Sequence, residues 1–188
     1  KFLDTNVKYK LLGNANHFIQ AGQFKQPNSL EELSSTKNND FISKAAVTNT
    51  YAVARRLGGA YSYGQDNWSV TASAFGRELT RNLAHGSGYG ARGTFAPINE
   101  KGQVLHFGLS YVDYDADADT LRVRARPNAD LATARLVDSG NMTDTDRVST
   151  LGAEAMYFQG PFKAQAEYYS SKAKRYDHDN YTSDGYYV

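Results

Sequence analysis

The chain repeats a segment of about ten residues in which polar and apolar side chains alternate. In the clearest copy one face carries Leu105, Phe107, Leu109 and Tyr111, and the other carries His106 and Ser110. Successive side chains of an extended strand point to opposite faces, so a period of two indicates a strand with one apolar and one polar surface. Similar segments occupy residues 1–12, 68–74, 89–95 and 162–168. We expect about nine strands and an all-β fold.

The connections between these segments alternate in length. Short turns are expected at residues 13–16, 64–67, 98–103 and 158–161, and long connections at 25–50, 78–87, 115–147 and 175–183. Short turns at one end and long loops at the other are typical of an outer-membrane barrel. A soluble lipocalin-like barrel also alternates in polarity, but loops of about twenty to thirty residues would be unusual there. We therefore favour a transmembrane antiparallel β-barrel whose long loops fold into the lumen.

Composition excludes several other classes of protein. The chain has no cysteine, which removes a disulfide framework and a thiolate zinc site. A formal net charge of +1 argues against a nucleic-acid binder. Asp113, Asp115, Asp117 and Asp119 alternate as in a calcium loop, but Ala118 and Arg124 stand where such a loop needs glycine and glutamate. We find no set of nucleophile, base and orienting group, and we expect neither an enzyme, a cofactor nor a metal.

Arg122, Arg124 and Arg126 alternate with small apolar residues in the longest connection. In an extended backbone the three guanidinium groups lie on one side of the strand. There they repel one another unless an anion binds between them. A solvated edge strand protected by arginines is the simpler interpretation. However, a spanning strand needs about 9–11 residues, so this stretch belongs in a loop of residues 115–147. Its apolar side can pack on the barrel wall, and we expect the arginines to line the lumen.

Several stretches resemble the phosphate-selective porin family of Gram-negative outer membranes. They are Gly22-Gln-Phe-Lys-Gln-Pro-Asn-Ser-Leu-Glu-Glu-Leu33, Arg92-Gly-Thr-Phe-Ala-Pro-Ile-Asn-Glu100, Val104-Leu-His-Phe-Gly108, Arg124-Ala-Arg-Pro127 and Gly160-Pro-Phe-Lys-Ala-Gln-Ala-Glu-Tyr168. Because they occur in family order from near residue 1 to residue 188, the resemblance covers essentially the whole chain.

This resemblance implies a sixteen-stranded, trimeric barrel that conducts phosphate-like anions past a ladder of basic side chains. Residues 1–188 would form one domain, the central part of a longer porin, with residues 25–50 and 115–147 as pore-constricting loops. The implied surroundings are outer-membrane lipid and lipopolysaccharide, and nucleic acid is not a partner.

The resemblance also assigns individual residues. Ser35, Thr36 and Lys37 match the hydroxyl-rich binding stretch, and Lys44 stands where a pore arginine is expected. Arg124 and Arg126 match the basic ladder. Glu32 departs from the family pattern, which places an anion-contacting lysine there.

The residue types at these positions suit an oxyanion. Guanidinium groups offer paired hydrogen bonds, hydroxyl groups offer neutral ones, and a spaced array of cations avoids binding any anion too tightly. Ser34, Ser35, Thr36 and Lys37 supply this mixture, although a helix cap or a polar loop explains the same residues. Arg92 lies on the same strand face as Thr94 and is expected to extend the array.

Two other functions stay open. A general porin of broad specificity is compatible with Glu32. A barrel whose outward loops serve adhesion or structural packing is also possible, but it would not need cations along its lumen. The anion channel is the function that the sequence favours.

Overall fold

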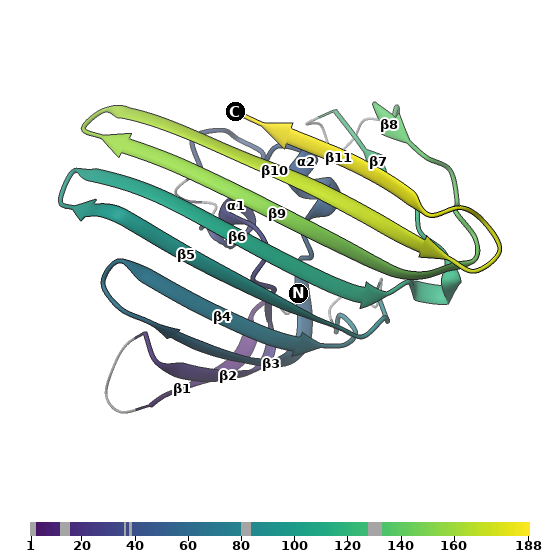
Figure 1. Ribbon diagram of the computed structural model, residues 1–188, viewed down its shortest axis with the longest axis horizontal. Coiled ribbons are helices and arrows are strands. Elements are labelled where there is room, and N and C mark those ends of the chain that lie inside the picture. The colour runs from purple at the N-terminus through teal and green to yellow at the C-terminus, as the bar shows by residue number, and fades with distance from the viewer. Residues whose placement is uncertain (1–2, 12–15, 36, 38, 80–83, 128–132) are drawn as a thin grey trace.

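The computed structural model describes residues 3–11, 16–35, 37, 39–79, 84–127 and 133–188. Most of them form one antiparallel sheet of nine strands in the order β1-β2-β3-β4-β5-β6-β9-β10-β11 (Figure 1). The all-β prediction is confirmed. Within the described residues β1 and β11 end this order and do not pair with each other.

The strands of the sheet are β1 (Thr5–Lys10), β2 (Phe18–Lys25), β3 (Arg55–Gly64), β4 (Trp68–Phe75), β5 (Gly88–Glu100), β6 (Gln103–Asp115), β9 (Thr145–Gln159), β10 (Phe162–Arg175) and β11 (Tyr181–Tyr187). A separate hairpin is made by β7 (Arg124–Ala125) and β8 (Val137–Asp138). The α-helices are α1 (Leu30–Leu33) and α2 (Ala46–Tyr51), and a 3₁₀ turn covers Asp117–Asp119. No helix in the described part of the chain is long and apolar enough to cross a membrane.

The connections follow the predicted alternation with one exception. Residues 65–67, 101–102 and 160–161 are tight turns, and residues 26–54, 76–87 and 116–144 are long loops. The predicted turn at 13–16 lies mostly outside the described residues. The predicted long connection at 175–183 is wrong, because residues 181–183 pair with β10 and only residues 176–180 join the strands. Its polar composition indicated a loop, but Asn180 accepts a hydrogen bond from the Arg175 amide and closes a compact turn.

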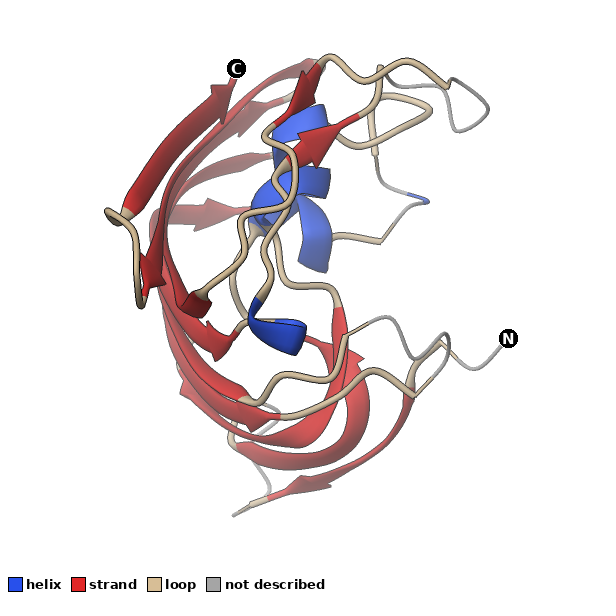
Figure 2. Ribbon diagram, turned by 90° about the vertical axis from the view of Figure 1, so that its right-hand side faces the viewer, coloured by secondary structure: helices blue, strands red, loops and turns tan. Residues whose placement is uncertain are grey.

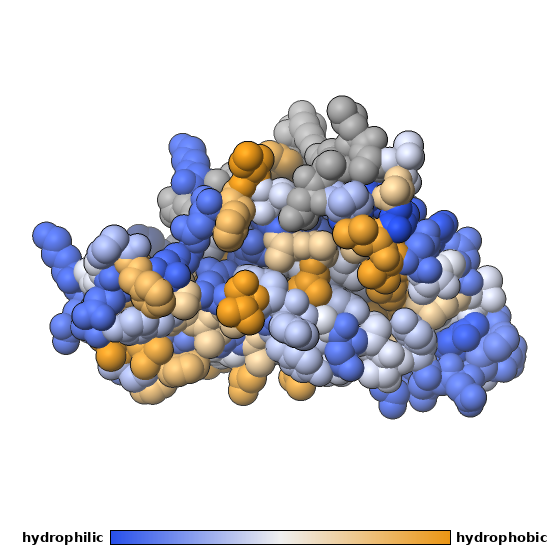
Figure 3. All heavy atoms as spheres, turned by 90° about the horizontal axis from the view of Figure 1, so that it is seen from above, coloured by the Kyte–Doolittle hydropathy of each residue, from blue (hydrophilic) through white to orange (hydrophobic). Residues whose placement is uncertain are grey.

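The two faces of the sheet have opposite polarity. Phe107, Leu109 and Tyr111 are exposed on the outer face, whereas Ser110 is buried on the inner face and His106 contacts Glu154 there. The predicted orientation of this strand is therefore confirmed for these side chains. In Figure 3 apolar side chains gather along part of the lower edge of the view, and others lie among polar side chains nearer its middle.

The inner face is unusually polar for a buried surface. A small apolar cluster of Val53, Phe75 and Val112 is packed beside Tyr114. Most other buried groups are polar, among them Gln23, Gln26, Ser29, Thr48, Ser62, Ser73, Thr150, Glu154, Glu167 and Ser171. An apolar outside and a polar inside are the reverse of a soluble protein and match a barrel that faces lipid outward and water inward.

The loop of residues 26–54 folds back onto the concave face of the sheet, where α1 and α2 lie in Figure 2. The Ser73 hydroxyl donates to Gln26 Oε1 at 2.9 Å, and the Ser110 hydroxyl donates to the Asn28 carbonyl at 3.3 Å. Further along, the Tyr51 ring stacks on Tyr169 with centroids 5.9 Å apart. These contacts reach β4, β6 and β10, so the prediction that this loop turns inward is confirmed. That it constricts a pore stays a prediction.

The loop of residues 116–144 carries the β7–β8 hairpin, which lies beside α2 (Figure 2). Its side chains alternate as predicted, because Val123 is buried while Arg122 and Arg124 are exposed. A bridge between Leu121 and Met142 closes the base of the loop. The hairpin therefore packs next to the inner loop, so that the two longest loops gather at the same end of the sheet.

Candidate functional site

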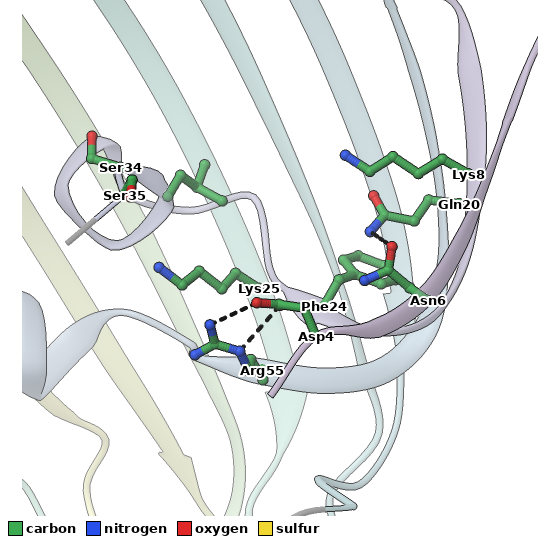
Figure 4. Close-up of a pocket in the computed structure, with 10 residues that line it drawn as sticks. Asp4, Asn6, Lys8, Gln20, Phe24, Lys25, Ser34, Ser35 and Arg55 are labelled. Atoms are coloured by element: carbon green, nitrogen blue, oxygen red, sulfur yellow. Dashed lines mark hydrogen bonds and ion pairs between the residues drawn. The ribbon is translucent and has the colours of Figure 1, made fainter. Parts of the chain in front are cut away.

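A cavity of about 530 Å³ opens on the concave face where α1 approaches β1, β2 and the start of β3 (Figure 4). It is lined by Asp4, Asn6, Lys8, Gln20, Phe24, Lys25, Leu33, Ser34, Ser35 and Arg55. The strand register places these side chains together, because Lys8 stands opposite Gln20 and Asn6 opposite Gly22. Gly22 has a φ of +122°, and a Cβ there would lie 2.3 Å from the Thr5 carbonyl oxygen, so this close approach of β1 and β2 requires glycine.

Three cations line the cavity. Arg55 is held in place by a bidentate pair with Asp4, with nitrogen–oxygen distances of 3.1 and 2.8 Å. Lys8 Nζ lies 4.8 Å from the centroid of the Phe18 ring. In Figure 4 the Lys25 side chain extends toward the loop that carries Ser34 and Ser35. Ammonium, guanidinium and hydroxyl donors thus surround one space, which suits a ligand with several acceptor oxygens.

Glu32 introduces a negative charge beside these cations. Its carboxylate lies 3.7 Å from Lys25 Nζ and forms a close ion pair with Lys44. Glu32 is only 7% exposed, so this interaction is weakly screened by solvent. Lys25 Nζ also donates to the Glu32 backbone carbonyl, which ties the end of β2 to α1. The local charge of Lys25, Lys44 and Glu32 is therefore +1 rather than +2.

The predicted hydroxyl stretch is partly at the cavity. Ser34 and Ser35 line it, and the Lys37 amide donates to the Ser35 hydroxyl at 3.4 Å. Thr36 lies outside the described residues. Ser34 also caps the end of α1, since its hydroxyl donates to the Leu30 carbonyl at 2.8 Å. The Ser34 side chain therefore both lines the cavity and caps the helix, so the two interpretations of this residue, anion binding and helix capping, are compatible.

The predicted arginine stretch lies on the β7–β8 hairpin. Arg122 makes two hydrogen bonds to Asp138, at 2.7 and 2.6 Å. The pKa of Asp138 is lowered to about 2, mainly by the Arg122 side chain and then by the Gly140 amide. Arg124 and Arg126 follow on the exposed side of the same segment.

A fourth arginine joins this group from the returning strand. The pKa of Arg135 is lowered by desolvation and by the nearby charges of Arg126, Arg124 and Arg122. The hairpin therefore brings four guanidinium groups near one another, and Arg122 among them is bonded to the Asp138 carboxylate. This cluster is called the hairpin arginines below (Arg122, Arg124, Arg126 and Arg135).

Arg92 stands apart from both groups. It forms a bidentate pair with Glu154, which also accepts a hydrogen bond from His106 Nε2 at 2.7 Å when that nitrogen is protonated. Glu154 is 7% exposed, so the guanidinium charge of Arg92 is compensated on the inner wall. In the described part of the chain, no cluster of three or more His, Asp or Glu side chains is placed to hold a metal ion.

Sequence reasoning missed Lys8, Lys25, Arg55 and Arg135 as candidate binding residues. The alternation placed Lys8 on the polar face of its strand together with Asp4 and Asn6. The alternation of polar and apolar residues did not single out Lys25 and Arg55. They reach the cavity because β2 pairs with β3 and the loop between these strands folds inward. Arg135 is separated from Arg126 by eight residues and approaches it only when the hairpin forms.

The comparisons with known proteins agree with this architecture. All of residues 1–188 match the family model described as phosphate-selective porin O and P. Porin O of Pseudomonas aeruginosa is 34% identical over 116 residues, which is 52% of this chain and 26% of that protein. An uncharacterised protein of Caulobacter vibrioides is 27% identical over 188 residues, covering 93% of this chain and 37% of that protein. The chain thus spans between about a quarter and two fifths of these relatives. With a family match along its whole length, the chain belongs to the phosphate-selective porin O and P family.

Proposed function

We propose that this chain forms part of an outer-membrane channel through which phosphate-like anions diffuse passively. The observation that carries the proposal is the cavity in which Lys8, Lys25 and Arg55 meet Ser34 and Ser35 on the inner face of the sheet. A partly dehydrated oxyanion needs such converging donors, and charge-assisted hydrogen bonds are the stronger ones. The family, described as phosphate-selective porin O and P, supports the same class of substrate.

In the same proposal, the hairpin arginines and the outer face of the sheet also contribute to the channel. The hairpin arginines raise the local concentration of anions at the end where the long loops gather, and the cavity provides the contacts during passage. Lys37 contributes further positive charge on the loop, whereas the charges of Lys44 and Arg92 are offset by Glu32 and Glu154. The exposed apolar outer face contacts outer-membrane lipid and lipopolysaccharide of a Gram-negative cell, and the assembled channel is a homotrimer. The activity is diffusion and not catalysis.

The test is conduction by the complete gene product in planar bilayers. The wild-type channel should show an anion-selective reversal potential, and added phosphate should block the chloride current. Lys25→Gln should weaken this block about tenfold, equivalent to about 1.4 kcal/mol, because one charge-assisted donor is lost. Lys10→Gln is the matched control, since Lys10 is an exposed lysine of β1 that does not line the cavity. A cation-selective wild-type channel, or equal block in both variants, would refute the proposal.

A general porin of broad specificity is the second candidate, and the specific observation in its favour is Glu32. The Glu32 carboxylate forms ion pairs with Lys25 and Lys44, so it competes with an incoming anion for the same two cations. Such a site would pass many small anions with little preference for phosphate. Comparing block by phosphate, sulfate and acetate separates the two functions, because a general porin would show similar, weak block by all three.

A further inference from the structure

In the described part of the chain, Glu167 is a carboxylate of the inner wall that accepts five hydrogen bonds. It is 3% exposed and lies on β10, far from the loop in sequence. From the wall, the hydroxyl groups of Tyr169 and Tyr187 donate to it at 2.8 and 2.7 Å. From the loop, the Leu30 and Glu31 amides donate at 2.9 and 2.8 Å. The Ser29 hydroxyl adds a longer contact of 3.4 Å.

These five donors compensate a buried charge without an ion pair. Among the described residues, no Lys, Arg or His side chain contacts the Glu167 carboxylate. A buried ionised group is very costly unless its oxygen atoms are hydrogen-bonded. If the loop left the wall, the carboxylate would lose three donors and keep only the two tyrosines. The cost of that loss opposes any movement of the loop away from β10.

The donors of the loop are the first amides of α1. Backbone amides at a helix start have no partner within the helix, so a carboxylate is a favourable acceptor there. Ser29 completes the arrangement, because its hydroxyl accepts from the Glu32 amide at 3.0 Å while contacting Glu167. Since α1 is one short turn, fixing its start also fixes Leu33, Ser34 and Ser35, which follow at once and line the cavity.

We infer that Glu167 is a positioning residue for the anion cavity: it holds α1 against β10 and thereby sets where Ser34 and Ser35 present their hydroxyl groups. The inference rests on the proposed function for what those hydroxyl groups bind. The position of the loop itself does not depend on that function. Glu167 would then contribute to anion affinity although it carries a negative charge and does not line the cavity.

A spin label on the loop tests this positioning directly. These 188 residues contain no cysteine, so Ser35→Cys adds one attachment site here, in a complete gene product whose cysteines outside these residues, where present, are replaced by serine. Glu167→Gln should increase the mobility of this label, because the amide nitrogen of glutamine faces donors and cannot accept from them. Glu167→Asp retains the charge but is shorter by one methylene group, and it should give an intermediate mobility.

Glu154→Gln is the matched control for label mobility. Glu154 stands directly opposite Glu167 on β9 and is similarly buried, but its carboxylate contacts Arg92 and His106 instead of the loop. It should leave the label as immobile as in the unmodified background. Equal mobility in the Glu167 and Glu154 variants would overturn the inference. If Glu167→Gln does not assemble, an unchanged label in Glu167→Asp would overturn it as well.

Phosphate block measured without the label completes the experiment. Glu167→Gln should weaken block about tenfold, equivalent to about 1.4 kcal/mol, by displacing Ser34 and Ser35. If the label becomes mobile but the wild-type channel shows no block by phosphate, the proposed function fails while the positioning role of Glu167 stands. If wild-type block is present but the label does not respond to Glu167→Gln, the positioning role fails alone.

Discussion

At the scale of single residues, the charge beside the cavity is decided by Glu32. Its carboxylate lies between Lys25 and Lys44, where, in the proposed function, it competes with a bound anion. Truncating one member of a buried charged group changes affinity more than truncating an exposed one, because the partner charges are poorly solvated. In the proposed function, a change at Glu32 is therefore expected to alter anion affinity.

Glu32→Gln should strengthen phosphate block of the chloride current. Removing the carboxylate frees both lysines while the side-chain volume is kept, and we expect about a tenfold gain, or about 1.4 kcal/mol. Glu100→Gln serves as the control, because Glu100 is exposed at the turn between β5 and β6. Unchanged or weaker block in Glu32→Gln would show that this carboxylate orders the site rather than competing with the anion.

At the scale of the element, a charged pair joins the segment just before β7 to Asp138 of β8 in the hairpin. The backbone of Arg124 pairs in register with Asp138, and the Arg122 side chain is hydrogen-bonded to the Asp138 carboxylate. The pKa of Asp138 is lowered to about 2 in the folded chain, below the ordinary value of 3.8. A depressed carboxyl pKa stabilises the fold above the ordinary value, and this contribution is lost as the pH falls through the lowered one.

The hairpin should therefore stay ordered from pH 7 down to about 4 and loosen between about 4 and 2. A spin label at Leu136→Cys, an exposed position next to β8, reports this through its mobility. In an Asp138→Asn background the label should be mobile already at pH 7 and should respond little to acid. A transition centred near pH 6 to 7 would contradict the assignment, because Asp138 does not titrate there.

At the scale of the whole molecule, the near-neutral net charge conceals an uneven distribution. Four arginines gather on the hairpin, beside α2 at the end of the sheet where the long loops lie. Arg122 is paired with Asp138, and Arg124 and Arg135 place further positive charge beside it. Such a field attracts anions before they reach the cavity, and it attracts them less as salt screens it.

Replacing Arg124 and Arg135 together by Gln should shift the reversal potential in a salt gradient toward cation permeation. The shift should be largest near 0.1 M salt and small near 1 M, because the Debye length falls from about 10 Å to about 3 Å. It should not change between pH 6 and 9, since guanidinium groups stay charged. Lys101→Gln, in the turn at the opposite end, is the control for loss of a distant charge. Selectivity that is equal in both variants would place the hairpin arginines outside the path of the ions.

For the strands that the sequence placed, such as residues 105–111, the face of each side chain was determined by the sequence alone. The period of two is a local property, since adjacent residues of a strand point to opposite sides whatever the strand pairs with. It therefore predicted the outward Phe107 and Leu109, the inward Ser110, and the alternation of Val123 with Arg122 and Arg124. The sequence also predicted which connections are short and which are long, except at residues 175–183. There the polar composition indicated a loop, although residues 181–183 belong to a strand.

Only the tertiary structure decided which side chains meet. Lys25 and Arg55 approach Ser34 and Ser35 because the strands pair and the loop folds inward, and Arg135 joins Arg126 because the hairpin closes. The contact of Glu167 with Leu30 joins residues 137 positions apart, and no local pattern marks it. Local periodicity reports the surface that each side chain faces. Convergence of distant residues depends on register and loop path, which are set by the free energy of the whole fold.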